Sequence, residues 1–200
     1  EANTLTEVED IYRPYKQKRK TRASVAIARG LQPLADAIFA QDKTLDVKKE
    51  AEKYITEEVP AVKDAIDGAR DIIAERISDD AATRKKLRNF FFNHGEITSS
   101  YVKGKEEEDK ARTYEMYKAH SEPVSEIKSH RVLALNRGEK EKILTVKIVA
   151  PEEKILRYLN KMVITRENPV TTPILQEVIA DSYNRLIAPA IEREVRNLMT

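Results

Sequence analysis

The sequence predicts a mainly α-helical, multihelical fold with one β-hairpin and a long, kinked C-terminal helix. Two observations lead to this prediction. Apolar residues recur at helical spacing through most of the 200 residues, whereas the clearest strand signal is confined to residues 129–149. The five glycines, eight prolines and 35% charged residues are typical of a helix-rich protein with a charged surface.

The predicted hairpin consists of residues 131–135 and 143–149. Both runs are apolar and contain β-branched residues, and the polar loop between them holds Gly138, where a turn would need a positive φ angle. In the second run every other residue from Leu144 to Ile148 is apolar, so one face of the strand should lie on a helical core. A two-stranded hairpin is marginally stable alone. Helices from both halves of the chain are therefore expected to support it.

Residues 1–125 are predicted to form an N-terminal helical part made of short helices. Thr4, Thr21 and Asp46 are suited to cap helix N-termini, and Gly30 suits the position just after a helix C-terminus. The strongest helical pattern of this part follows Pro60. Its apolar stripe comprises Val62, Ala65, Ile66, Ala69, Ile72, Ile73 and Ile77. Residues 96–103 are expected to be extended.

Residues 151–200 are predicted to form the C-terminal helices. Pro151 and the two acids after it favour one helix start, and Thr172 with Pro173 favours the start of the last helix. The apolar spacing of this helix continues beyond Pro189, which predicts a kink rather than an end. The first residue is Glu1 and the helical pattern still runs at the last residue. We therefore interpret residues 1–200 as one helical scaffold segment of a larger protein.

The composition excludes several classes of protein. The chain has no cysteine, which excludes disulfides and thiolate metal sites and fits a reducing cytoplasm. No apolar run approaches the roughly 20 residues of a membrane span, so no membrane contact is expected. The histidines at 94, 120 and 130 are far apart, and the isolated glycines form no phosphate-binding or dinucleotide-binding motif. We therefore expect no enzymatic activity, no cofactor and no metal.

The basic segment, Arg13 to Arg22, is the best candidate for a functional site. It contains six basic residues and no acid, whereas the rest of the chain carries 30 bases against 34 acids. Bases interleaved with tyrosines could hold phosphates and stack on a nucleic-acid base. The candidate nucleic-acid-binding residues are Arg13, Tyr15, Lys16, Lys18, Arg19, Lys20 and Arg22. The charge pattern also permits a solvated connector or contact with an acidic protein surface.

Several segments, in this order, resemble the Tex family of bacterial transcription accessory proteins. The segments are LTEVEDIYRPYKQKRKTRASVAIARGLQPLADAI (5–38), GARDIIAERISDDA (68–81), VKGKEEE (102–108), SEP (121–123), SHRVLALNRGEKE (129–141) and YNRLIAPAIEREVR (183–196). The resemblance covers essentially the whole chain. It implies a cytoplasmic bacterial protein that acts in transcription regulation through RNA or DNA.

The resemblance also implies a much longer protein. Members of this family have a helical N-terminal region with helix-turn-helix character, then a ribonuclease-H-like domain, helix-hairpin-helix elements and an OB-fold RNA-binding domain. The present chain resembles the helical part that precedes the ribonuclease-H-like domain. Nucleic acid is thus an implied partner, mostly through modules absent from this segment, and transcription machinery is another. The family is also similar to a eukaryotic elongation factor that works as a scaffold at the polymerase. The sequence leaves the oligomeric state open.

Overall fold

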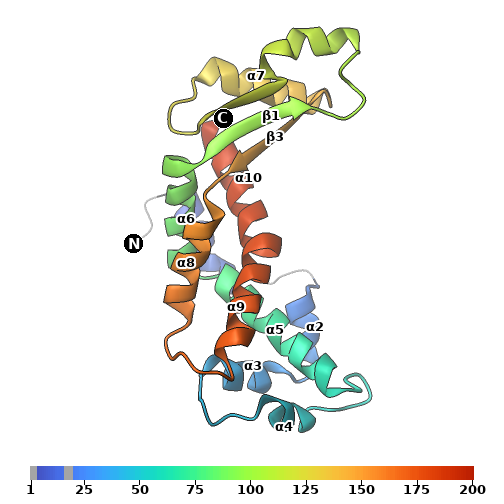
Figure 1. Ribbon diagram of the computed structural model, residues 1–200, viewed down its shortest axis with the longest axis vertical. Helices are drawn as coiled ribbons and strands as arrows, with labels where there is room; N and C mark the ends of the chain where they lie inside the picture. Colours follow the sequence, from blue (N-terminus) through green and yellow to red (C-terminus); the bar gives the residue numbers. More distant parts are fainter. Residues whose placement is uncertain (1–3, 16–19) are drawn as a thin grey trace. The chain divides into compact units, whose positions relative to one another are not determined.

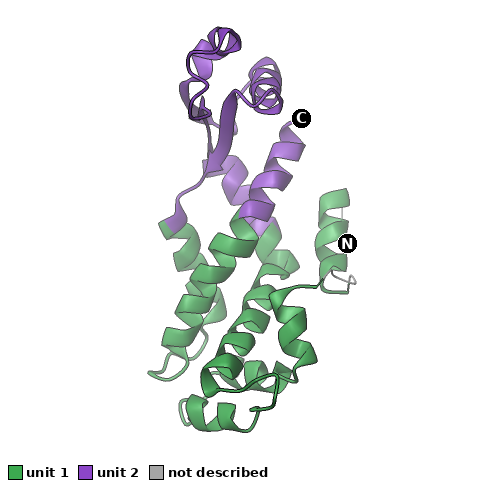
Figure 2. Cartoon of the chain, turned by 90° about the vertical axis from the view of Figure 1, so that its right-hand side faces the viewer, with its two compact units in different colours: residues 1–84, 153–188 green, residues 85–152, 189–200 purple. Residues whose placement is uncertain are grey.

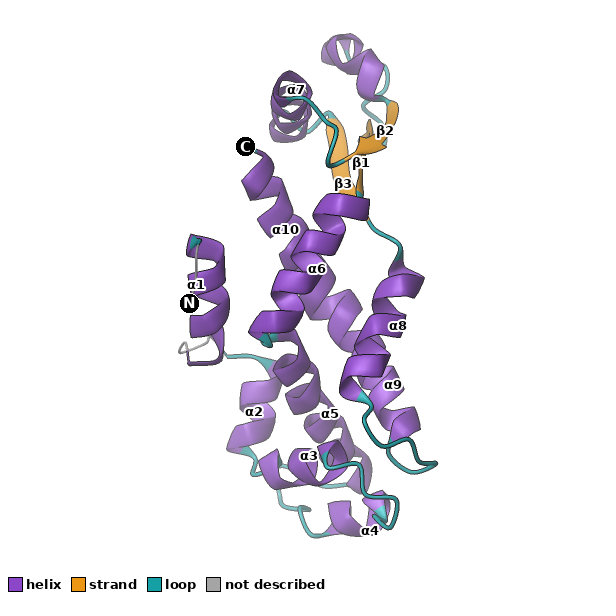
Figure 3. Cartoon of the chain, turned by 90° about the vertical axis from the view of Figure 1, so that its left-hand side faces the viewer, coloured by secondary structure: helices purple, strands orange, loops and turns teal. Residues whose placement is uncertain are grey.

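The computed structural model describes residues 4–15 and 20–200 and confirms the mainly α-helical class (Figure 1). The described residues form ten α-helices and one three-stranded antiparallel sheet, which Figure 3 distinguishes by colour. The chain divides into two compact units (Figure 2). Unit 1 consists of residues 1–84 and 153–188, and unit 2 consists of residues 85–152 and 189–200.

Unit 1 is helical. Its elements are α1 (Leu5–Tyr12), the short 3-10 helix η1 (Arg13–Tyr15), α2 (Arg22–Ala28), α3 (Gln32–Phe39), α4 (Val47–Glu52), α5 (Val62–Ser78), α8 (Glu152–Val163), α9 (Thr172–Asp181) and the π-helical segment η3 (Ser182–Ile187). The helix α6 (Ala81–His94) begins in unit 1 and continues in unit 2. The central helix of unit 1 is α5, which contacts α2, α3, α4, α9 and η3. Its buried stripe includes Ala65, Ala69, Ile73 and Ile77, which confirms the strongest helical pattern of the sequence.

Three of the helix starts predicted in unit 1 are confirmed by side-chain hydrogen bonds. The hydroxyl of Thr4 accepts from the Glu7 N–H (3.2 Å), and that of Thr21 accepts from the Ser24 N–H (3.0 Å). The carboxylate of Asp46 accepts from the N–H three residues later (3.1 Å). Each cap gives a partner to an N–H that the first helical turn leaves unpaired.

Unit 2 is built around the sheet. Its elements are β1 (Glu96–Tyr101), the 3-10 segment η2 (Asp109–Tyr117), β2 (Ala119–Pro123), α7 (Ser129–Lys140), β3 (Leu144–Val149) and α10 (Ala188–Met199). The strand order is β2-β1-β3, and both pairs are antiparallel. Ser99 in β1 lies opposite His120 in β2 and Val146 in β3. The central strand β1 confirms the expected extended structure after Gly95.

The predicted hairpin of residues 131–135 and 143–149 is wrong in its first half. Residues 129–140 form the helix α7, which buries Val132 and Leu135 at a spacing of three and leaves Leu133 63% exposed. The second half is the strand β3, whose residues alternate between buried and exposed as predicted. β3 pairs with β1, which is distant in sequence. The prediction failed because the short run of residues 131–135 does not distinguish a strand from a buried helical turn.

Gly138 explains part of this error. It lies inside α7 rather than in a turn, and the residue with positive φ is Lys142 (60°), just beyond the helix. A Cβ atom on Gly138 would lie 2.5 Å from Cδ1 of Leu144. The glycine is therefore required for the close approach of α7 to β3, not for a turn.

The predicted long C-terminal helix is confirmed. Helical structure continues from α9 through η3 into α10, that is, from Thr172 to Met199. The wider π-helical turns of η3 end just before Pro189, which has no N–H to donate and would crowd a regular α-helical turn. In unit 1 the Ser182 hydroxyl at the start of η3 donates to the Ala74 carbonyl of α5 (2.6 Å).

Candidate nucleic-acid interface

The described residues of the basic segment lie between α1 and the first turn of α2. Arg13 and Tyr15 belong to η1, Lys20 is exposed just before the cap residue Thr21, and Arg22 is the first residue of α2. Lys16, Lys18 and Arg19 lie outside the described residues. The side chain of Tyr15 is 82% exposed. An aromatic ring of this exposure beside several bases can stack on a nucleic-acid base.

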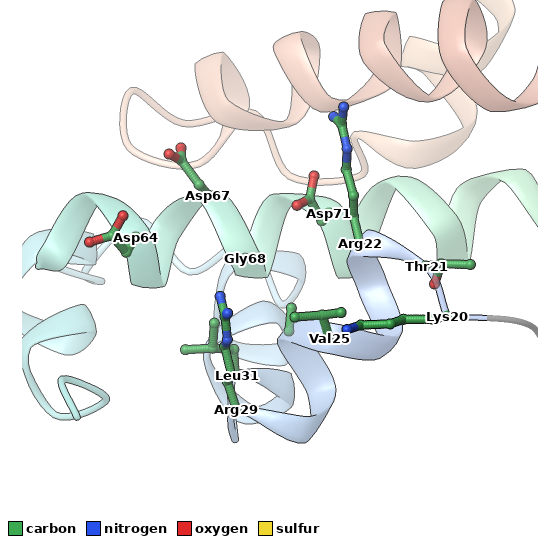
Figure 4. Close-up of a pocket in the computed structure, with 11 residues that line it drawn as sticks. Lys20, Thr21, Arg22, Val25, Arg29, Leu31, Asp64, Asp67, Gly68 and Asp71 are labelled. Atoms are coloured by element: carbon green, nitrogen blue, oxygen red, sulfur yellow. The ribbon is translucent and has the colours of Figure 1, made fainter. Parts of the chain in front are cut away.

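A cleft of about 460 Å³ begins at the C-terminal end of this segment (Figure 4). Three bases line it from the α2 side and three acids line it from α5. The bases are Lys20, Arg22 and Arg29, and the acids are Asp64, Asp67 and Asp71. Figure 4 shows the Arg22 side chain extending past Asp71. The cleft therefore carries charges of both signs rather than a purely positive surface.

The acids lie on one side of α5 because they are separated by three and four residues. Burial raises the pKa of Asp71, and the positive charges of Arg185 and Arg22 oppose that rise. The charge of Arg22 thus acts on a partly buried carboxyl of the protein itself. Arg22 is consequently less suited to bind a phosphate than the bases that precede it.

A second cleft of about 310 Å³ continues this charge pattern toward α9. It is lined by Arg22 and Asp71 together with Arg70, Glu177 and Asp181 among others. Arg70 Nη2 lies 2.8 Å from a carboxylate oxygen of Glu177. Arg185 Nη2 lies 2.9 Å from a carboxylate oxygen of Asp181 and 3.8 Å from one of Asp71. Both distances are short enough for an ion pair. These ion pairs compensate the bases on this side of unit 1.

Sequence reasoning missed the acidic wall of the cleft. Asp64, Asp67 and Asp71 are remote in sequence from the basic segment, and a count of charges along the chain cannot bring the two together. One signal was present in the sequence: the three aspartates alternate with the apolar stripe of α5 at helical spacing. Because α2 and α5 pack on one another, the aspartates line one cleft together with Arg22.

Two of the described histidines contact residues of their own elements. Across residues 4–15 and 20–200, no three His, Asp or Glu side chains converge where they could hold a metal ion. His120 contacts Glu122, whose carboxylate also accepts from Arg131 Nη1 at 3.2 Å, so this histidine lies beside an ion pair between β2 and α7. His94 ends α6 and its ring lies 4.8 Å from that of Phe90. In the described part of the chain, no helix has the length and apolar character needed to cross a membrane.

Residues 42–200 match a family model described as Tex central region-like. The chain is 50% identical over 194 residues to the uncharacterized protein YdcI of Bacillus subtilis, an alignment that covers 96% of the chain and 27% of YdcI. It is 37% identical over 187 residues to the transcriptional accessory protein Tex of Neisseria gonorrhoeae (94% of the chain, 22% of the relative).

A human relative extends the similarity to eukaryotes. The S1 RNA-binding domain-containing protein 1 of Homo sapiens is 30% identical over 211 aligned positions, which cover 98% of the chain and 21% of that protein. The chain thus spans between about a fifth and about a quarter of the length of these relatives.

Proposed function

We propose, since the chain belongs to the Tex central region-like family, that it is a non-enzymatic scaffold part of a transcription accessory factor that binds nucleic acid in the cytoplasm. Two of its relatives are named for the relevant roles. The gonococcal protein is called a transcriptional accessory protein, and the human protein is named for an S1 RNA-binding domain. In this proposal the chain supports nucleic-acid-binding modules that lie outside residues 1–200 and adds a phosphate contact of its own.

The observation that supports a contact within the chain is the exposure of Tyr15 inside the basic segment. Six bases within ten residues give a local positive field that a polyanion would neutralise. The acids of α5 offset this field near Arg22, at the C-terminal end of the segment, and not near its first residues. We therefore assign the phosphate contacts to residues 13–20 and the stacking contact to Tyr15.

A helical protein-interaction module is the second candidate function. The same bases could bind an acidic protein surface, and the mixed charges of the clefts beside α5 are compatible with a protein partner. The two candidates differ in what they require of the ligand. The nucleic-acid site requires a ligand with regularly spaced phosphates and nucleobases that can stack, whereas an acidic protein surface supplies carboxylates alone.

A competition experiment on the 200-residue chain separates these candidates. Fluorescence anisotropy would follow a labelled oligouridylate, with unlabelled oligouridylate, the matching deoxy oligomer and polyglutamate of equal charge as competitors. We expect both nucleic acids to compete well and polyglutamate to compete poorly, and Tyr15→Ala to weaken binding of the nucleic acids. Equal competition by polyglutamate, with no effect of Tyr15→Ala, would favour the protein-interaction module.

A further inference from the structure

We propose that the outer edge of β3 is a strand-pairing surface for a second copy of the chain, and that Glu192 of α10 keeps this surface closed. β3 is an edge strand, because the strand order of the sheet is β2-β1-β3. Edge strands offer backbone donors and acceptors on which another strand can pair. The inference goes beyond the nucleic-acid role, because it concerns residues of unit 2 and another class of partner.

The hydrogen-bond ladder shows which backbone groups of β3 point outward. The Val102 N–H donates to the Ile143 carbonyl at 2.8 Å, where the ladder between β1 and β3 ends. In an antiparallel ladder successive residues direct their backbone groups to opposite sides of the strand. Every second residue counted from Ile143 therefore faces β1. The residues between them face the outer edge and are Leu144, Val146 and Ile148.

The outward N–H of Ile148 is bound by a side chain. Oε1 of Glu192 accepts from it at 3.0 Å, in the place that a carbonyl of a neighbouring strand would take. α10 therefore lies beside the outer edge of β3 (Figure 1). Farther along this edge, Val146 lines a cleft of about 540 Å³ together with residues of α10 and α7. The carboxylate thus closes one end of an edge that borders open space.

The sequence of β3 favours pairing with an identical strand. The strand, LTVKIV, contains four β-branched residues, a single charge and neither glycine nor proline. Segments of this composition pair with identical segments of other chains when their edge is exposed. Natural sheets protect such edges with a charged side chain or a covering element. In unit 2, Glu192 supplies the charge and α10 supplies the cover.

A second copy of β3 matches the edge in both hydrogen bonding and charge. A two-fold axis through Val146 would place this residue opposite itself and Leu144 opposite Ile148 of the other copy, so that outward donors meet outward acceptors. On the exposed face of the strand, Lys147 of one copy would lie opposite Thr145 of the other. No like charges oppose one another in this register. The strand is therefore complementary to itself.

Glu192→Ala would free the Ile148 N–H and open the edge. Sedimentation velocity of the 200-residue chain over a concentration series should show dimers of this variant, with an association constant at least about tenfold above that of the parent. Glu192→Gln keeps an oxygen acceptor and should behave like the parent. The matched control is Glu115→Ala, which removes an exposed acid of η2 in unit 2 and should also behave like the parent. Circular dichroism checks that each variant keeps the helical content of the parent.

Two further variants test the register of the pairing. Both are made together with Glu192→Ala, and both change the residue that would lie opposite Lys147 of the other copy. Thr145→Lys places like charges opposite one another and should weaken self-association, whereas Thr145→Glu places opposite charges there and should strengthen it. The contact of Glu192 itself is measured by amide hydrogen exchange in dilute solution. The Ile148 N–H should exchange faster in Glu192→Ala than in the parent.

Three outcomes would overturn the proposal. The first is equal self-association of the parent and Glu192→Ala. The second is equal self-association of the two Thr145 variants, which would place the contact elsewhere on the chain. The third is equal exchange of the Ile148 N–H in the parent and in Glu192→Ala, which would show that the carboxylate does not protect the edge. None of these measurements involves nucleic acid, so their failure leaves the nucleic-acid role standing.

Discussion

Asp10 and Arg84 form a buried ion pair that joins α1 to the start of α6 within unit 1. Their side chains are 3% and 2% exposed, and the Arg84 guanidinium also donates through Nη1 to the Ser78 carbonyl at 2.9 Å. A buried charge is costly without a partner, so each residue of the pair stabilises the charge of the other. The pair holds the polar side of α1 against the start of α6.

Removing one member of this pair should destabilise unit 1 strongly. Asp10→Ala would remove a carboxylate from the buried Arg84 charge, and we expect a loss of about 3 kcal/mol in the free energy of unfolding. Urea unfolding monitored by circular dichroism measures this loss. The control is Glu9→Ala on the exposed side of the same helix, which should change stability by less than about 0.5 kcal/mol. Equal midpoints for the two variants would mean that the pair does not hold α1.

Gly138→Ala tests the corrected assignment of residues 129–140. In a helix interior this change normally stabilises by about 1 kcal/mol, but here the new Cβ would lie within 3 Å of two Leu144 side-chain atoms. Leu144 is 2% exposed and has little room to move, so overpacking should prevail and cost about 1 to 2 kcal/mol. Thermal melting against Lys140→Ala, on the same helix, measures the difference. A stabilised Gly138→Ala variant would contradict the close approach of α7 to β3.

Tyr114 should make unit 2 sensitive to alkaline pH. Burial raises the pKa of Tyr114, and its hydrogen bond to the Glu141 carboxylate (2.9 Å) raises it further. The neutral phenol is thus favoured in the folded state. Its contribution to stability is complete below the unfolded pKa of about 10 and is lost as the pH rises through the folded value.

Tyr114→Phe isolates this effect. Near neutral pH the variant should be about 1 kcal/mol less stable than the parent, because it lacks the hydrogen bond. As the pH rises above about 10, the stability of the variant should fall less than that of the parent. Urea unfolding at a series of pH values measures both changes. Parallel stability curves for parent and variant would show that Tyr114 does not titrate differently in the folded and unfolded states.

Local signals in the sequence identified much of unit 1. Thr4, Thr21 and Asp46 cap helices because each needs only the N–H groups of the following turn. Gly30 has a φ angle of +81° just after α2, as a residue beyond a helix end should. The long stripe of α5 was equally predictable, because its apolar period repeats over many turns.

Features that depend on tertiary contacts were not predictable in the same way. The five residues from Arg131 to Leu135 are too few to separate a strand from a helix, and the decision depends on β1 being available to pair with β3. β2 was missed because its sequence, AHSEP, has little strand character by itself. The acids of α5 that line a cleft with Arg22 likewise enter the candidate site only through the packing of α2 on α5.

The salt dependence of polynucleotide binding by the full-length protein tests the central claim most directly. If about three to five bases of the basic segment contact phosphates, they contribute about −2 to −5 to the slope of log binding constant against log salt. Glutamate in place of Lys16, Lys18, Arg19 and Lys20 should weaken binding and flatten the slope with little effect on melting, because the substitutions remove no apolar side chain. The control places glutamate at four exposed lysines elsewhere in unit 1, Lys43, Lys48, Lys49 and Lys154, with the same change of net charge. We predict a flattened slope in the first variant and a smaller change in the control. If the first variant keeps the affinity and slope of the parent, the result would contradict a nucleic-acid role for this segment.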